Sequence, residues 1–131
     1  MTEALGEFVR LVNEGAYWES HEVLEAPWRD QGSDFYQGLI LYASAFVHVD
    51  RGNPHGIRAQ LRKALERLGP YPETYLGVDV EGIRRHAREV RETVGALEDD
   101  PPERWWSVIE RPRLSLAPGD VRGNEPELAG G

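Results

Sequence analysis

Apolar residues recur every three or four positions along most of this chain, which is the spacing that one face of an α-helix produces. No run alternates apolar and polar residues as a half-buried strand would. The pattern predicts five helices, over residues 3–14, 17–29, 34–51, 54–68 and 80–97, with a loop at 71–78. Because mostly short segments join them, we expect an all-α, single-domain antiparallel bundle of about five helices, followed by an extended C-terminal tail.

The helix expected over residues 34–51 differs from the others, because its apolar residues cover nearly its whole circumference. A helix of that kind is buried on all sides, so we expect this one at the centre of the bundle. Gly38 lies within it, although glycine costs about 1 kcal/mol relative to alanine in a helix interior. We therefore expect a neighbouring helix or aromatic ring to pack closely against Gly38.

Residues that commonly begin or interrupt helices mark the junctions. Ser33 or Asp34 can cap the third helix, Asn53 the fourth and Asp79 the fifth. Pro27 interrupts the second helix, because proline lacks an N–H group and its ring clashes with the preceding turn. That helix is therefore expected to kink at Pro27, or to end and restart there.

The chain after residue 98 has a different composition. An acidic, proline-containing linker precedes Trp105 and Trp106, and from Pro112 the sequence is rich in proline and glycine. We expect residues 1–98 to form the helical bundle, and residues 99–131 to form a linker, a docking segment and a tail. Two adjacent indoles are costly to leave in water. At least one is therefore expected to be buried, on the same bundle or across a homodimer contact.

Composition narrows the classes of partner and compartment. The 131 residues carry 15 basic and 23 acidic side chains, and the net charge of −8 opposes binding to nucleic acid or to an anionic membrane. No residue is cysteine, so disulfides, thiolate nucleophiles and cysteine-bound zinc are excluded. The N-terminus lacks a signal-peptide core, and the longest apolar run is shorter than the ~20 residues of a membrane span. We therefore expect a cytoplasmic protein.

Residues 17–29 hold the densest group of side chains capable of chemistry. His21 and Glu25 are four residues apart, which lets an imidazole and a carboxylate reach one divalent metal ion from the same helix face. His48, near the end of the central helix, could supply a third metal ligand. The full candidate ligand-binding cluster consists of Trp18, His21, Glu22, Glu25, Trp28, Tyr36 and His48.

Two interpretations of this cluster stay open. In the first, His21, Glu22, Glu25 and His48 form a hydrogen-bonded network that fixes the register of the second and third helices. In the second, His21, Glu25 and His48 bind a divalent metal or a small ligand. The spacing lacks the second imidazole of the His-Glu-x-x-His zinc motif, so it is not the motif of that protease class.

Three classes of function follow. The principal hypothesis is a non-catalytic interaction or scaffold domain, which contacts a protein partner or a second copy. The alternative is a metal or small-ligand binding module built on the cluster, and a third class is a metal-dependent hydrolase with Glu22 as general base. No catalytic residue is identified. His86 lies between Arg85 and Arg88 and is expected on the surface.

Two motifs also resemble a known family. The first is the segment 15–25 with Trp28 and Arg29, and the second is the segment 35–40 with Ala43, Ala45, His48 and the run 51–53. Together they resemble the small prokaryotic family called domain of unknown function 309, over roughly residues 8–97. The resemblance implies a compact all-helical domain and implies no particular activity. The tail after Trp106 lies outside it.

Overall fold

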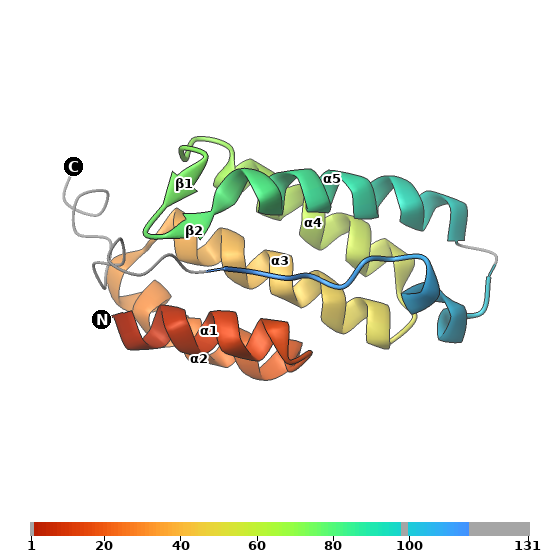
Figure 1. The fold of residues 1–131 in the computed structure, drawn as a ribbon, viewed down its shortest axis with the longest axis horizontal. Helices are drawn as coiled ribbons and strands as arrows, with labels where there is room; N and C mark the ends of the chain where they lie inside the picture. The colour runs from red at the N-terminus through yellow and green to blue at the C-terminus, as the bar shows by residue number, and fades with distance from the viewer. Residues whose placement is uncertain (1, 98–99, 116–131) are drawn as a thin grey trace.

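The protein folds as a bundle of helices, as the apolar pattern predicts (Figure 1). The computed structural model describes residues 2–97 and 100–115. Its elements are α1 (Thr2–Asn13), α2 (Tyr17–Gln31), α3 (Asp34–Asp50), α4 (Pro54–Leu68), β1 (Thr74–Tyr75), β2 (Val78–Asp79), α5 (Val80–Leu97) and the 3₁₀-helix η1 (Pro102–Ser107). The all-α fold class is confirmed. The predicted tail beyond residue 115 lies outside the described residues.

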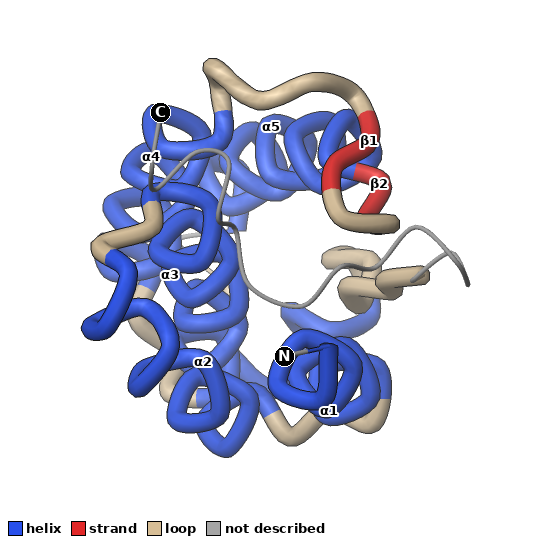
Figure 2. Tube along the Cα trace, turned by 90° about the vertical axis from the view of Figure 1, so that its left-hand side faces the viewer, coloured by secondary structure: helices blue, strands red, loops and turns tan. Residues whose placement is uncertain are grey.

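The helices follow one another around the bundle in chain order. Each of α1 to α5 packs on the next, and the end-on view shows α1 and α5 as the two ends of this series (Figure 2). The central helix is α3, which packs on α2, α4 and η1. Its buried residues are Phe35, Tyr36, Gly38, Leu39, Ile40, Tyr42, Ala43, Ala45, Phe46 and Val49. This confirms the prediction that α3 is buried on more than one face.

The predicted helix caps are present. The Ser33 side chain accepts a hydrogen bond from the Tyr36 amide at 3.0 Å. The Asn53 side chain accepts one from the Gly56 amide at 3.1 Å, and the Asp79 carboxylate accepts one from the Gly82 amide at 3.0 Å. Each bond satisfies an amide that the first turn of a helix leaves without a backbone partner. The three junctions read from the sequence are therefore confirmed.

Two local predictions are corrected. Of the two alternatives at Pro27, an end and restart of the second helix is wrong, because α2 runs unbroken to Gln31 and stops at Gly32, whose φ is +61°. The kink at Pro27 stays a prediction. Leu24, three residues before Pro27, is buried in the core. Such packing can offset the loss of the backbone hydrogen bond that proline cannot donate.

The segment expected as a loop contains the short antiparallel hairpin β1–β2. Leu76 and Gly77 join its strands with φ values of 51° and 80°, as a tight hairpin turn with two positive φ angles requires. Strands of two residues are too short to show an alternating pattern.

Gly38 makes the close contact that the sequence predicts. A Cβ atom added there would lie 2.7 Å from Cγ and Cδ2 of Leu68, which is fully buried. By contrast, a Cβ atom added at Gly95 on α5 would meet no atom within 4 Å. The packing of α3 on α4 therefore requires a glycine at Gly38, whereas no such contact requires one at Gly95.

We expect these two glycines to respond oppositely to alanine. Gly38→Ala should lower the free energy of unfolding by about 1–3 kcal/mol, because the added methyl group overpacks the contact with Leu68. Gly95→Ala should raise it by about 0.5–1 kcal/mol, because alanine is the better helix former and has space. Urea denaturation of both variants measures the difference. Equal effects at the two positions would contradict this account of the α3–α4 contact.

The chain after α5 returns across the bundle. After η1, residues 108–115 form an extended segment, here called the strap, which lies over α3 between α1 and α5 (Figure 1). Trp105 is 2% exposed and Trp106 is partly buried against the same core. The prediction that at least one indole is buried is confirmed, and the burial is within the bundle. Among the described helices, none is long and apolar enough to cross a membrane.

Candidate functional site

The first half of α2 presents an exposed indole that its neighbours hold in place. Trp18 is 52% exposed, and its ring centroid lies 5.4 Å from that of His21. The guanidinium carbon of Arg51, at the end of α3, lies 5.9 Å from the centroid of the Trp18 ring. Contacts of an imidazole and a cation with an indole are attractive and orient the ring. Arg51 was not among the residues predicted for this cluster.

A short series of charged contacts continues along the same helix. Nε2 of His21 lies 3.5 Å from Oε2 of Glu25, and Oε1 of Glu25 lies 3.0 Å from Nη2 of Arg29. The expected contact between His21 and a neighbouring carboxylate is thus present. Nδ1 of His21 is buried and has no hydrogen-bond partner. Glu22 is exposed on the same helix.

His48 is held by a different set of contacts. Its Nδ1 atom lies 3.2 Å from Nδ2 of Asn53, whose side-chain oxygen already accepts from the Gly56 amide. The Asn53 amide group is therefore the donor, and Nδ1 of His48 accepts. Burial, and then the charge of Arg51, lower the pKa of His48 below its ordinary value. These contacts favour a neutral imidazole tied to the α3–α4 junction.

The structure does not bring the three predicted metal ligands together. Across residues 2–97 and 100–115, no group of three or more His, Cys, Asp or Glu side chains is placed to hold a metal ion. Of the remaining predicted residues, Tyr36 is fully buried beside Phe35, and Trp28 is partly buried against the core. The exposed residues of the cluster are therefore Trp18 and Glu22, and the His21–Glu25 pair is partly buried.

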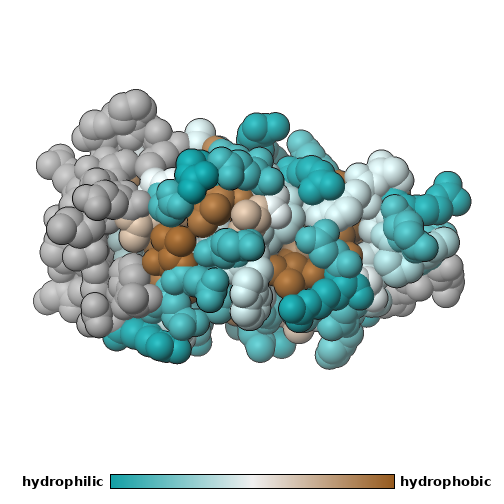
Figure 3. Space-filling view, turned by 90° about the horizontal axis from the view of Figure 1, so that it is seen from below, coloured by the Kyte–Doolittle hydropathy of each residue, from teal (hydrophilic) through white to brown (hydrophobic). Residues whose placement is uncertain are grey.

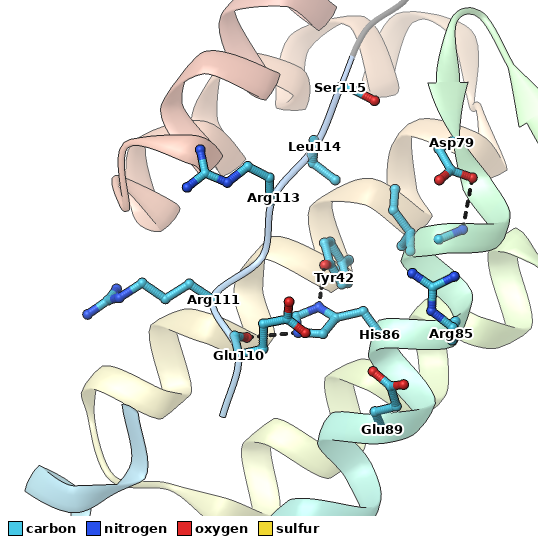
Figure 4. A pocket seen from close by; sticks show the side chains of 12 residues that line it. Tyr42, Asp79, Arg85, His86, Glu89, Glu110, Arg111, Arg113, Leu114 and Ser115 are labelled. Carbon is cyan, nitrogen blue, oxygen red and sulfur yellow. Dashed lines mark hydrogen bonds between the residues drawn. The ribbon is translucent and has the colours of Figure 1, made fainter. Parts of the chain in front are cut away.

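A second polar group lies where the strap runs beside α5. His86 is only 9% exposed, so the prediction of a surface residue was wrong. Its Nε2 atom donates to the Glu110 carbonyl oxygen at 2.8 Å, and its Nδ1 atom accepts from the Tyr42 hydroxyl at 2.7 Å (Figure 4). The carbonyl can only accept, which assigns the proton to Nε2. The ring also stacks on Phe46, with centroids 5.6 Å apart.

The strap explains both the burial of His86 and the pocket beside it. Burial raises the pKa of Tyr42, so this hydroxyl stays protonated and donates to His86. A polar pocket of about 120 Å³ lies next to the pair (Figure 4). Its lining comes from Tyr42, Asp79, Gly82, Ile83, Arg85, His86, Glu89, Glu110, Arg111, Arg113, Leu114 and Ser115. No local sequence signal could have placed the strap beside α5.

The fold and these contacts define a small helical-bundle domain whose C-terminal segment packs back on the bundle. Residues 5–60 match the family model of the domain of unknown function DUF309, which spans α1 to the first turns of α4. The family resemblance read from the two motifs is thereby confirmed for this stretch.

A relative is known from Aquifex aeolicus (strain VF5). It is described as an uncharacterized protein, and it is 29% identical to this chain over 101 residues. The match covers 73% of this chain but spans only 29% of the relative's length. The relative therefore carries a region like this bundle within a longer protein.

Proposed function

We propose that this protein is a non-catalytic interaction domain that pairs with a second copy of itself through the exposed face of α2. The observation that carries the proposal is Trp18, a large aromatic side chain that is 52% exposed yet held by His21 and Arg51. Tryptophan and arginine are the residue types that most often anchor protein interfaces. An indole that is already oriented loses little conformational freedom on binding.

The surface of the face that carries α2 also supports pairing. The face formed by α1 and α2 shows apolar surface in patches between polar side chains (Figure 3). A two-fold interface uses the same surface on both copies, so that surface must complement itself. On α2 the exposed Glu22 precedes the exposed Arg29 by two turns. Two antiparallel α2 helices would therefore place Glu22 of each copy opposite Arg29 of its partner.

Sedimentation velocity over a range of concentrations tests this function. Wild type should form a dimer, and Trp18→Ala should weaken association about tenfold or more, as loss of an anchor residue does. Val108→Ala is the matched control, because Val108 is the other large hydrophobic side chain exposed among the described residues, at 56%, and it belongs to the strap and not to α2. It should associate as wild type does. A wild type that stays monomeric, or equal loss in both variants, would contradict the proposal.

A second candidate function is binding of a divalent metal or a small ligand at His21 and Glu25. The 3.5 Å separation of His21 Nε2 and Glu25 Oε2 favours it. The two atoms are close enough to share one ion, with the rest of its coordination coming from solvent or from a ligand. This candidate does not require His48.

Metal content and thermal unfolding separate the two candidates. If the pair binds an ion, added Zn²⁺ should raise the melting temperature of wild type but not of His21→Ala. His55→Ala, an exposed histidine at the start of α4, is the control and should respond as wild type does. An absent response in wild type, with no metal in the purified protein, would leave pairing through α2 as the supported function.

A further inference from the structure

The bundle binds the main chain of the strap through side chains, as a receptor binds an extended peptide. Nδ2 of Asn13, at the end of α1, donates to the Leu114 carbonyl at 2.8 Å. Oδ1 of the same side chain accepts from the Leu114 amide at 2.7 Å. On the other side, His86 of α5 donates to the Glu110 carbonyl. Two helices far apart in sequence thus satisfy the backbone of a segment that has no regular secondary structure of its own.

The strap's side chains divide into those that face the bundle and those that face solvent. Ile109, Pro112 and Leu114 are buried, whereas Glu110, Arg113 and Ser115 are exposed. Arg111 is exposed as well, but its guanidinium carbon lies 4.1 Å from the centroid of the Trp106 ring, and Nη1 lies 3.4 Å from the Tyr17 hydroxyl. The bundle therefore contacts the side chains of an extended segment with the pattern apolar-x-Arg-Pro-x-Leu.

The strap packs less completely than the helices around it. The polar pocket of about 120 Å³ lies along its α5 side and is lined by strap residues on one wall (Figure 4). A segment with solvent on one side and no backbone hydrogen-bond ladder of its own opens more easily than a core helix. The chain before it is fixed more firmly, since Trp105 is buried and Nε1 of Trp106 donates to Asp50 at 2.9 Å. The Val108 and Ile109 amides donate to the Trp105 carbonyl at 3.0 and 2.8 Å, so the natural point of opening follows this turn at the end of η1.

This hinge limits where a detached strap can go. Eight extended residues span at most about 28 Å, so the free strap stays near its own bundle. A second copy would have to bring its own bundle within that reach to insert its strap. The site is better matched to an extended segment of another protein with the same pattern, and an arginine in that segment also suits a chain of net charge −8.

We propose that the surface formed by Asn13, Tyr17, Tyr42, His86 and Trp106 is a recognition site for an extended apolar-x-Arg-Pro-x-Leu peptide of a partner protein. The strap is its resident ligand and competes with the partner. This proposal is independent of pairing through α2, because none of its contacts involves Trp18, Glu22 or Arg29.

The test uses the full chain and a fluorescein-labelled peptide with the sequence of residues 108–115. In the double variant Ile109→Asp/Leu114→Asp the strap is weakened, so it should bind the peptide at least tenfold more tightly than wild type does in fluorescence anisotropy. Adding Asn13→Ala to that variant should reduce binding about tenfold. A peptide with the arginine of position 111 replaced by glutamate should bind less well. Absence of binding to the folded double variant, or binding that Asn13→Ala leaves unchanged, would overturn the proposal.

Native-state hydrogen exchange of wild type decides the matter if the double variant does not fold. The Leu114 amide, which is bonded to Asn13, should exchange through a local opening at least 100-fold faster than amides in the middle of α3. That rate should not change at low denaturant concentration, as local opening requires. Exchange of Leu114 only through global unfolding would show that the strap is an inseparable part of the core and would overturn the proposal.

Discussion

Replacing Phe46 by alanine is expected to cost about 3–5 kcal/mol of unfolding free energy, which is the usual range for a buried phenylalanine. Phe46 is fully buried in the second half of α3. Its ring lies 5.2–6.2 Å, centroid to centroid, from four others. These belong to Tyr17, Tyr42, His86 and Trp106. They come from α2, α3, α5 and η1, so loss of one ring removes contacts to four elements.

Chemical denaturation followed by circular dichroism measures this effect. Val47→Ala is the matched control, because Val47 is the next residue of the same helix and is only partly buried. It should cost much less, since part of its surface is already in water. If Phe46→Ala unfolds within 1 kcal/mol of wild type, α3 is not the packing centre of the bundle.

The second large loss of stability is expected when Trp105 is replaced by alanine. Its side chain is 2% exposed, and Nε1 donates to the Asp100 carbonyl at 3.2 Å. Trp105→Ala should cost about 3–5 kcal/mol, because it leaves a large cavity and a carbonyl without its donor. Trp106→Ala should cost less, since that indole is only partly buried.

Thermal unfolding of both variants, and of a chain truncated after residue 98, gives the measurement. The truncated chain should lose stability or aggregate, because it exposes the core surface that Trp105, Ile109 and Leu114 cover. A truncated chain that is monomeric and as stable as wild type would show that the segment contributes nothing to the bundle.

The parts of the fold that depend on local sequence were predictable. The caps at Ser33, Asn53 and Asp79 each act on an amide three residues ahead, so the signal and its effect lie in one turn. The His21–Glu25 contact is likewise set by helix geometry alone. Periodicity also identified α3 as central, because only a helix buried on several sides is apolar nearly all round.

Features that depend on distant parts of the chain were not predictable in the same way. Asn13 and Leu114 are 101 residues apart, and nothing near either residue signals the other. The position of His86 between two arginines resembles a surface position, and the strap beside α5 contributes to its burial. His48 was a candidate third metal ligand, and its Nδ1 atom instead contacts the Asn53 side chain that caps α4.

The function proposed here depends most directly on Glu22 of one copy lying opposite Arg29 of the other. Charge reversal tests that pairing, and sedimentation velocity reads it out. Glu22→Arg and Arg29→Glu should each be monomeric alone, because each brings like charges together twice across the two-fold axis. An equimolar mixture of the two variants should restore the dimer, since every pair is then of opposite charge. A mixture that sediments as the separate variants do would contradict pairing through α2.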